Sequence, residues 1–321
     1  MSEIITLAIC TYNNGSLLNK TLATIEKQCV DASIMWSTIV IDNNSNDGTQ
    51  QLVQTYIQSS RIPGLHYVLE KQQGLAYARR RAVAETKSEL IAFIDDDCLL
   101  SPDWVEQAIA FCRNHPMAGA VGGRVELLWE TPPDEFLLQC KASLSAQDYG
   151  DLPTQLPSTG WTYLVGAGLL LRRKALESSG WIDSADLVDR CGSKLTSGGD
   201  IEIVLRIRKA GYQLWYNPAM QLQHYIPQRR MSVEYLCNLH RGFGQGDHIL
   251  HLLAYDEKPT LAWRFRRIFI SVHSLIRQLL GILVREILLG KKISPVRLLL
   301  LQRALGNIKG AYHFMGQEYQ R

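Results

Sequence analysis

Short runs of Val, Ile and Leu alternate with helical patterns through the first hundred residues, and this alternation is the feature that most constrains the fold. The runs at residues 4–9, 38–41 and 90–94 are typical of buried strands. Between them apolar residues recur at helical spacing, as Leu18 and Leu22 do. The chain is therefore predicted to form an α/β domain, with a mostly parallel sheet flanked by helices.

Polar residues follow the predicted strands at the points where the strands end. Thr11, Tyr12 and Asn13 follow the first strand, residues 42–45 follow the second, and residues 95–97 follow a later one. Open α/β sheets bind their ligands at the carboxyl ends of the strands. We therefore expect the functional site to lie where these three clusters meet.

Asp95, Asp96 and Asp97 place three adjacent carboxylates next to an apolar run. Burying an unpaired carboxylate costs several kcal/mol, and the side chains of Asp95 and Asp97 leave a strand on the same face. That pair suits a hard divalent cation, Mn2+ or Mg2+, with phosphate as a further ligand. The alternative is an acidic, solvated loop leading into the next helix, which we expect Ser101 to cap, with Pro102 at the first helical position.

Charge is distributed unevenly along the chain. Residues 260–321 contain eleven Lys/Arg and two Asp/Glu, a net charge of +9, whereas residues 1–259 carry −6. The cations alternate with aliphatic stretches such as 279–284 and 298–301, which favours an anionic membrane surface, and not nucleic acid, as the partner. Charged residues interrupt the longest apolar window, so helices lying in the membrane interface are predicted instead of a spanning helix. A basic helical subdomain packed on the body is the alternative.

Composition is that of a globular enzyme in a reducing compartment. Hydrophobic residues make up 46% of the 321 residues, enough for a sizeable core. The seven cysteines form an odd count without Cys-x-x-Cys spacing, which argues against a disulfide framework and a structural zinc site. The first residues show no signal-peptide pattern. We expect a cytoplasmic location, with peripheral attachment to the inner face of the cell membrane if the basic region binds lipid.

Several motifs, in a fixed order, make the chain resemble the family 2 glycosyltransferases, which are inverting, sugar-nucleotide-dependent enzymes of the GT-A (Rossmann-like) fold. The motifs are Thr11-Tyr12-Asn13, residues 41–49 (IDNNSNDGT), Gly74 with Ala78-Arg79, residues 93–97 (FIDDD), Gly166-Ala167-Gly168 with Arg172-Arg173, and Gly198-Gly199-Asp200 followed by residues 205–212. The resemblance covers roughly residues 4–226. The family's common Ala-Arg-Asn reads Ala78-Arg79-Arg80 here.

The resemblance implies a role for each motif. The family's DxD motif falls on Asp95 and Asp97, which implies a Mn2+ or Mg2+ ion held by these two carboxylates, with His224 as a third ligand. Asp200 takes the position of the catalytic base, and Gly199 stands where the family usually has glutamate. The implied contacts with the nucleoside-diphosphate sugar are Thr11, Tyr12, Asn13, Asp42, Asn44, Gly74, Arg79, Asp95 and Asp96.

Asp200 opens a predicted helix, whose positive N-terminal end would keep its carboxylate ionised. An ionised carboxylate accepts the proton of an attacking acceptor hydroxyl. Gly198 and Gly199 let the backbone approach a sugar closely. The alternative role for Asp200 is a plain N-cap, and Glu202 is the next carboxylate that would take the proton if Asp200 does not.

Other residues leave two interpretations open. Trp104 and Trp161 would each either stack on a sugar or lie in the core. The glycine-rich segment 242–246, together with Arg229, Arg230 and Arg241, would form either a flexible lid on the acceptor side or a plain turn.

Two regions and one leading function follow. Residues 1–230 are predicted to form the GT-A catalytic domain and residues 231–321 a helical, basic region. The leading hypothesis is an inverting glycosyltransferase of the hexosyltransferase type, which uses a UDP-sugar to extend a surface polysaccharide or a lipid-linked glycan. The alternatives are a catalytically weak sugar-nucleotide-binding or scaffolding protein and a sugar-1-phosphate nucleotidyltransferase, against which the absence of a glycine-rich phosphate loop argues.

Overall fold

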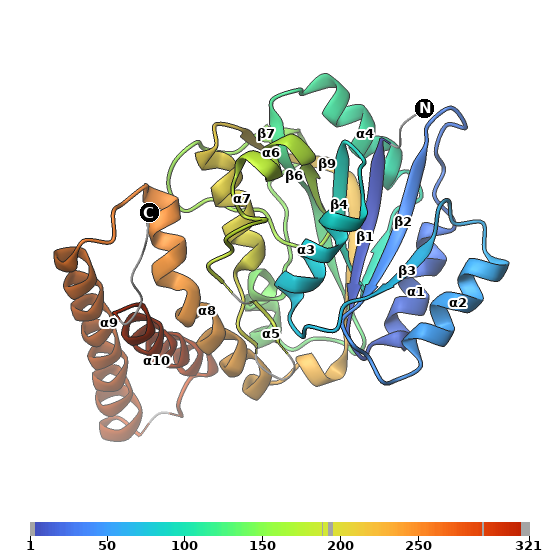
Figure 1. Ribbon diagram of the computed structural model, residues 1–321. Coiled ribbons are helices and arrows are strands. Elements are labelled where there is room, and N and C mark those ends of the chain that lie inside the picture. Colours follow the sequence, from blue (N-terminus) through green and yellow to red (C-terminus); the bar gives the residue numbers. More distant parts are fainter. Residues whose placement is uncertain (1–3, 188, 192–194, 291, 316–321) are drawn as a thin grey trace.

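The computed structural model describes residues 4–187, 189–191, 195–290 and 292–315. Its centre is a nine-stranded sheet with the order β3-β2-β1-β4-β8-β6-β9-β5, and β7 pairs with β9 outside this path (Figure 1). The strands are β1 (Ile5–Thr11), β2 (Trp36–Asp42), β3 (His66–Leu69), β4 (Leu90–Asp95), β5 (Cys98–Leu100), β6 (Ala118–Trp129), β7 (Thr154–Gln155), β8 (Leu169–Arg172) and β9 (Gln213–Ile226).

The sheet is mixed, with one dominant direction. β1 runs parallel to β2 and β4, β2 to β3, and β6 to β9, whereas β8 is antiparallel to β4 and β6, and β5 and β7 are antiparallel to β9. These pairings give β1, β2, β3, β4, β6 and β9 the same direction. The predicted α/β fold with a mostly parallel sheet is therefore confirmed.

Helices cover both faces of the sheet. The helices are α1 (Gly15–Ile25), α2 (Thr49–Ser59), α3 (Leu75–Glu85), α4 (Trp104–Asn114), α5 (Glu135–Gln139), α6 (Arg173–Ser178), α7 (Gly199–Lys209), α8 (Val233–Tyr255), α9 (Leu261–Ile282) and α10 (Pro295–Met315). Because strand side chains alternate between faces, Leu7 and Ile9 pack with α1, α2 and α4, while Ala8 packs with α3, α6 and α7. The two faces form two apolar cores.

Strand β9 is longer than the sequence pattern indicates. The pattern favours a strand that stops before Pro218, because proline cannot donate to the ladder. The structure instead shifts the register there: Asn217 pairs with Gly123, pairing resumes at Gln221 opposite Arg124, and the residues between them bulge out. The strand consequently continues to Ile226 and carries the residues of its second half back to the site.

Two local predictions are wrong. The helix after the aspartates begins at Trp104, two residues later than predicted, because the carbonyl of Ser101, and not its side chain, accepts the hydrogen bond of the Trp104 backbone N–H at 3.1 Å. The glycine-rich segment 242–246 is not a lid but an interior part of α8. A side chain at Gly244 would meet the backbone of α10, with its Cβ 2.2 Å from the Arg303 carbonyl oxygen, so these glycines serve close helix packing.

The last three helices lie beside the sheet domain (Figure 1), and α8 and α10 share apolar cores with it. Leu250 and Leu253 of α8 pack on Leu205 of α7, and Leu299 of α10 joins a cluster with Ile226 of β9. Three-residue and six-residue helical turns, Gln228–Arg230 and Leu283–Leu288, connect these elements. Among the described residues, each helix is too short or too polar to cross a bilayer.

Candidate active site

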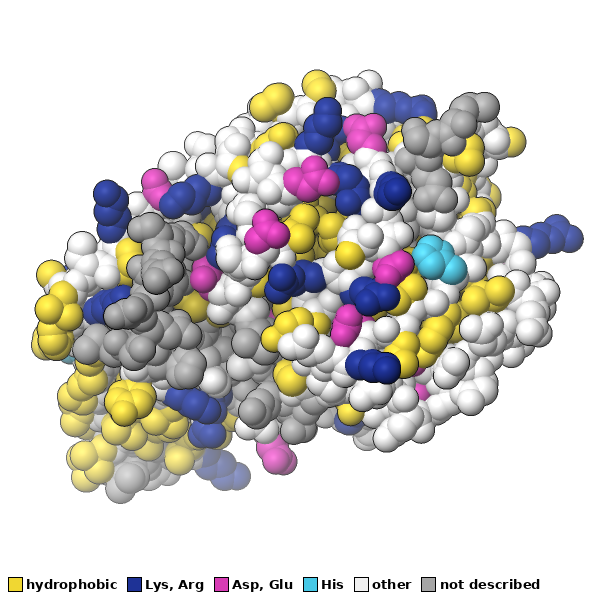
Figure 2. Space-filling view, viewed as in Figure 1, with side chains coloured by type: hydrophobic (Ala, Val, Ile, Leu, Met, Phe, Trp, Pro, Cys, Tyr) yellow, Lys and Arg dark blue, Asp and Glu magenta, His cyan; other side chains and the backbone are white. Residues whose placement is uncertain are grey.

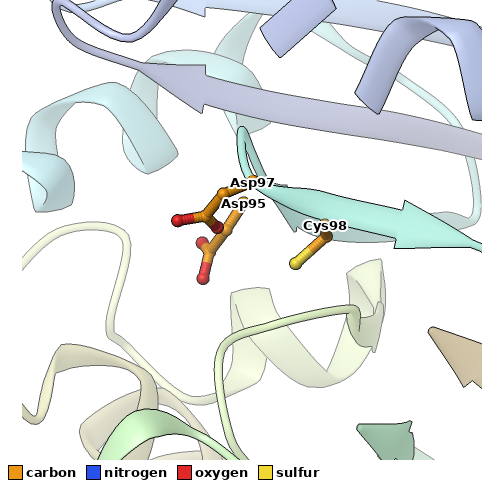
Figure 3. A group of neighbouring side chains, drawn as sticks. All are labelled: Asp95, Asp97 and Cys98. Atoms are coloured by element: carbon orange, nitrogen blue, oxygen red, sulfur yellow. The ribbon is translucent and has the colours of Figure 1, made fainter. Parts of the chain in front are cut away.

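The aspartate triplet forms the tight turn between β4 and β5. The ligand atoms of Asp95, Asp97 and Cys98 all lie within 4.8 Å of one another, and both carboxylates stand on the same side of the turn (Figure 3). Asp95 keeps 32% of its side chain exposed, whereas Asp97 is 2% exposed. The predicted common face of Asp95 and Asp97 is therefore present, and it opens toward solvent through Asp95.

Asp97 is held by Arg230 and His224. Its Oδ2 lies 2.8 Å from Nη1 of Arg230, and its Oδ1 lies 3.1 Å from Nε2 of His224. Burial by itself would raise the pKa of Asp97, but the neighbouring His224 and Arg230 outweigh it and hold that pKa well below the ordinary value of 3.8. Asp97 is thus ionised near neutral pH.

His224 lies beside Asp97, outside the group of ligand atoms that Asp95, Asp97 and Cys98 form. Its Nδ1 donates a hydrogen bond to the Leu144 carbonyl oxygen at 3.0 Å, because a carbonyl can only accept. A neutral His224 therefore turns a lone pair on Nε2 toward Asp97 Oδ1, a buried oxygen without a hydrogen-bond donor of its own. Arg230 Nη1, 3.5 Å from His224 Nε2 and 2.8 Å from Asp97 Oδ2, brings positive charge to this contact, and a metal ion would add more. Cys98 suits such an ion poorly, because burial raises the pKa of its thiol and hard cations prefer oxygen.

Asp96 faces away from this pair. Its Oδ2 accepts a hydrogen bond from Thr11 Oγ1 and its Oδ1 from Asn14 Nδ2, both at 2.7 Å. Burial and the adjacent Asp97 raise the pKa of Asp96 to about 7, against the lowering effect of these two hydrogen bonds. Asp96 therefore ties the turn to the end of β1, and its carboxyl group is only partly ionised near neutral pH.

A cavity of about 350 Å³ opens beside the turn. Thr11, Tyr12 and the three aspartates line one side of it, and Arg190, Arg229 and Arg230 line another. Tyr12 is 40% exposed at its edge. Carboxylates facing three guanidinium groups form a site suited to a ligand that carries both phosphate and a metal ion.

The loop after β2 supports the cavity mainly through its backbone. Asp42 is 1% exposed, and its carboxylate accepts hydrogen bonds from Ser45 N and Tyr67 Oη, both at 2.8 Å. Asn13 and Asn44 are exposed with left-handed backbone angles, φ 49° and 69°, and Asn13 Oδ1 accepts from Asn46 N. Asn13, Asp42 and Asn44 do not line the cavity, and their contact with a nucleotide stays a prediction.

Asn43 was not among the residues predicted to contact the donor, although its side chain lines the cavity. Its side chain donates to the Gln72 carbonyl at 2.7 Å and accepts from Gly74 N at 2.7 Å. Gly74 has φ 138° and immediately precedes α3, a backbone angle that glycine adopts readily. Asn43 therefore fixes the start of the helix that carries Arg79.

Arg79 lies under the cavity in a buried charge cluster. It is 3% exposed, its Nη1 lies 3.2 Å from Asp189 Oδ2, and its Nη2 lies 3.9 Å from Asp95 Oδ1. Burial would lower the pKa of Arg79, but Asp189, Asp95 and Asp200 raise it overall. Burial likewise raises the pKa of Asp189 to about 6, with Arg79 opposing that rise. Arg79 consequently acts on the turn as a fixed positive charge.

Asp200 lines a second cavity, of about 240 Å³, together with Trp161 and Tyr163. Its Oδ2 accepts from Gly166 N at 2.8 Å, and its Oδ1 accepts from Ile201 N at 2.9 Å. A Cβ at Gly166 would lie 2.8 Å from Arg79 Nη2 and 3.1 Å from Asp200 Oδ2, so glycine is needed for this close approach. Asp200 is half-buried and held in place from both sides.

Arg190 lines both cavities, so the cavity of the aspartate turn and the cavity of Asp200 adjoin. Arg190 escaped prediction because its segment carries no motif. The structure also separates the two tryptophans: Trp104 is fully buried in the core, while Trp161 is 37% exposed and lines the second cavity.

Glu202 differs sharply from Asp200. It is completely buried, and it accepts hydrogen bonds from Asp186 N and Leu187 N and pairs with Arg206 at 2.7 Å. Burial raises its pKa. Glu202 is a structural carboxylate and cannot reach a ligand in either cavity.

Comparison with known proteins identifies the family. The model of "Glycosyl transferase family 2" matches residues 6–180, more than half of the chain. The chain belongs to glycosyl transferase family 2. Family membership confirms the predicted resemblance and argues against the nucleotidyltransferase alternative.

Relatives within family 2 are distant. A glucosyl-dolichyl phosphate glucuronosyltransferase of Haloferax volcanii is 24% identical over 245 residues, which cover 75% of each chain. Glycosyltransferase AglE of the same organism is 24% identical over 220 residues, 66% of this chain and 64% of AglE. The match thus spans slightly less than two thirds of AglE.

Solved structures share the GT-A fold of family 2. The mannosyltransferase PcManGT from Pyrobaculum calidifontis, in complex with GDP-Man and Mn2+, aligns with a TM-score of 0.60 at 18% identity, over 98% of this chain and 88% of that one. GalNAc-T7, with UDP, GalNAc and Mn2+, aligns with a TM-score of 0.53 at 15% identity, over 75% and 47% of the two chains.

Proposed function

We propose that this chain is an inverting glycosyltransferase that moves a sugar from a nucleoside diphosphate to a hydroxyl of a glycan or lipid-linked acceptor, in the synthesis of a surface polysaccharide. The observation that carries the proposal is the pair of adjoining cavities. One combines the turn of Asp95 and Asp97 with three arginines, and the other presents Asp200, while Arg190 lines both. Donor phosphates and acceptor hydroxyl would thus meet from opposite sides of the transferred sugar.

The reaction exchanges one bond for another at the anomeric carbon. The bond from that carbon to the diphosphate oxygen breaks, the acceptor oxygen forms the new bond from the opposite face, and the acceptor proton passes to Asp200. Asp200 is suited to this role because Gly166 N and Ile201 N hold its two oxygens. The nucleoside diphosphate leaves with the bonding electrons.

We assign Asp95, Asp97 and His224 as the residues that would hold Mn2+ or Mg2+. Such an ion, when bound, supplies Lewis-acid stabilisation of the negative charge on the leaving diphosphate. Arg229 and Arg230, which line the same cavity, add positive charge that binds phosphate oxygens. Arg79 holds Asp95 from below and so fixes one of the proposed ligands.

The proposed donor is a UDP-sugar. Thr11, Tyr12 and Asp96 line the cavity, and we propose that the residues after β1 and β2, with Gly74, bind the nucleotide. PcManGT with GDP-Man and GalNAc-T7 with UDP show that the fold accepts either base, so GDP is the matched comparison in any test.

The acceptor side is proposed to face an anionic membrane, which would make the enzyme a cytoplasmic protein attached to the inner face. Apolar side chains of α9 and Arg/Lys side chains gather on the surface of the C-terminal helices (Figure 2). Phe265 and Phe269 of α9 are 56% and 71% exposed. We retain residues 231–321 as the membrane-associated region and residues 1–230 as the catalytic domain.

The proposal is tested by thermal shift with UDP, GDP and dTDP in the presence and absence of Mn2+. A ligand that binds only the native state stabilises it by mass action. Asp97→Ala should lose most of the Mn2+-dependent shift, whereas Asp103→Ala, an exposed carboxylate beyond β5, should keep it. Equal stabilisation of Asp97→Ala and the unmutated protein would contradict the metal assignment. Sugar transfer to an acceptor extract then separates an enzyme from a weak binding protein.

A further inference from the structure

The cavity of Asp200 continues into a third cavity, of about 260 Å³, under α9. Both cavities are lined by Trp161, Asp247 and Arg303. The second cavity thus contains the proposed base Asp200, and the third cavity is lined by Arg267 of α9. A ligand that follows this path would run from the transferred sugar toward the C-terminal helices.

The third cavity carries a net positive charge. Arg303 donates two hydrogen bonds to Asp247, both at 2.9 Å, so these two charges compensate each other. Arg267 is half-buried on the cavity wall, and among the described residues no carboxylate lies within ion-pair distance of it. Burial lowers the pKa of Arg267, which remains a cation. Asp247 and Glu257 attract this charge only from beyond ion-pair distance. A half-buried guanidinium without a direct carboxylate partner favours an anionic ligand, and phosphate matches its geometry.

Arg267 is held in a fixed orientation. His248 Nε2 donates to the Asn307 carbonyl oxygen at 2.7 Å, so His248 Nδ1 accepts the hydrogen bond of Arg267 Nε at 3.3 Å. The guanidinium also lies over the Trp263 ring, with 5.8 Å to its centroid. In the described part of the chain neither Nη group of Arg267 has an acceptor, so both remain available to a ligand.

The apolar face of α9 begins at the border of this cavity. Ile270 lines the cavity and is 44% exposed, and Phe269 and Ile276 on the same helix are 71% and 49% exposed. Figure 2 shows hydrophobic side chains gathered at the lower left, where Figure 1 places the C-terminal helices. An exposed apolar surface next to a phosphate-sized cationic cavity suits a molecule with a charged head and a hydrocarbon chain.

We propose that the second and third cavities bind the acceptor as a sugar joined through phosphate to a lipid chain, with the sugar hydroxyl at Asp200 and the phosphate at Arg267 and Arg303. The hydrocarbon chain leaves along the apolar face of α9 into the membrane. This inference rests on the proposed glycosyltransferase function and specifies its acceptor. Trp161 stands between the two cavities, where it would contact the link between sugar and phosphate.

Binding of farnesyl phosphate tests the inference, measured by tryptophan fluorescence because Trp161 and Trp263 adjoin the cavity. Farnesol and inorganic phosphate are titrated in parallel, to separate the lipid chain from the free anion. Arg267→Gln should weaken farnesyl phosphate binding about tenfold or more, which is the loss of affinity expected when one charge-assisted hydrogen bond is removed. Ser274→Asp, which adds a negative charge to the cavity wall, should do the same. Arg277→Gln, an exposed arginine of the same helix, should change it less than about twofold.

Three results would overturn the inference: farnesol binding as tightly as farnesyl phosphate, inorganic phosphate binding as tightly as farnesyl phosphate, or Arg277→Gln losing as much as Arg267→Gln. The Mn2+-dependent thermal shift with UDP, recorded on the same unmutated protein, distinguishes failure of the proposed acceptor from failure of the proposed function. A protein that binds UDP with Mn2+ but not farnesyl phosphate refutes the acceptor alone. A protein that binds neither refutes the proposed function.

Discussion

Replacing Asp200 with asparagine tests whether this residue accepts the proton of the acceptor. In the structure each carboxylate oxygen accepts one backbone N–H, from Gly166 at 2.8 Å and from Ile201 at 2.9 Å. Asparagine retains one acceptor oxygen and turns an NH2 donor toward the second N–H. Leaving that N–H unpaired costs about 1–3 kcal/mol, which lowers Tm by roughly 2–4 °C per kcal/mol in a chain of this size.

The chemical effect should be far larger than the structural one. A general base contributes about 100- to 10,000-fold to the chemical step, so transfer should fall by that factor when it is measured well below Tm. Asp200 lines the second cavity and not the cavity of the aspartate turn. Donor affinity by calorimetry should therefore stay within about threefold of the unmutated protein, a difference of less than about 1 kcal/mol. Asp97→Ala should lose both donor binding and transfer.

Retention of more than about a tenth of the transfer rate by Asp200→Asn would refute the role of base, since it lies well outside the expected range. Loss of donor binding in parallel with transfer would instead make Asp200 a binding residue. A Tm decrease much larger than that of one unpaired N–H would show that the variant misfolds, and transfer is then compared per folded molecule.

The other predictions concern pH, a buried ion pair and the membrane. The pKa of Asp96 rises from 3.8 to about 7 on folding, so the free energy of unfolding falls by up to about 4 kcal/mol as the pH rises between these two values. The Tm of Asp96→Asn should therefore exceed that of the unmutated protein at pH 8 but not at pH 4. A difference in Tm that does not depend on pH would contradict this. Glu202→Gln weakens the buried ion pair with Arg206 and should lower the free energy of unfolding, measured by urea denaturation, by about 3 kcal/mol. Sugar transfer per folded molecule should stay unchanged. An unchanged free energy of unfolding would refute the structural role of Glu202. Phe269→Ser should reduce co-sedimentation with anionic liposomes about tenfold, because it removes roughly 1.5 kcal/mol of apolar transfer free energy, and salt should release the unmutated protein from the liposomes. Leu152→Ser is the control, because Leu152 is 75% exposed but lies outside the C-terminal helices. An equal effect of the two changes would exclude a specific membrane-binding face.

The sequence predicts the sheet half that contains β1, β2 and β4 because local patterns determine it. Apolar runs, helical spacing and the polar residues at strand ends all act within a few positions of one another. The turn at Asp95–Asp97 and the opening of α7 at Asp200 follow from the same patterns, since each lies at an element boundary. The predicted N-cap at Ser101 was wrong because the sequence does not distinguish a residue that caps a helix through its side chain from a turn residue that accepts a hydrogen bond through its backbone carbonyl.

The tertiary structure decides what surrounds those residues. His224 meets Asp97 only because β9 bulges at Pro218 and resumes pairing, which sets His224 opposite Cys98. Arg230 reaches Asp97 from 133 positions further along the chain. No local pattern records either contact, because the register of a strand and the direction of a distant arginine depend on the packing of the whole sheet.

By itself the sequence determined the α/β fold, the family and the carboxylates at the ends of the strands, since these depend on local periodicity and short motifs. Only the tertiary structure decided that Asp97 is buried between Arg230 and His224, that Asp96 turns away to Thr11, and that Glu202 is structural. The physical reason is that burial and the distance between charges set the energy of each carboxylate. Both quantities exist only once distant segments have packed together.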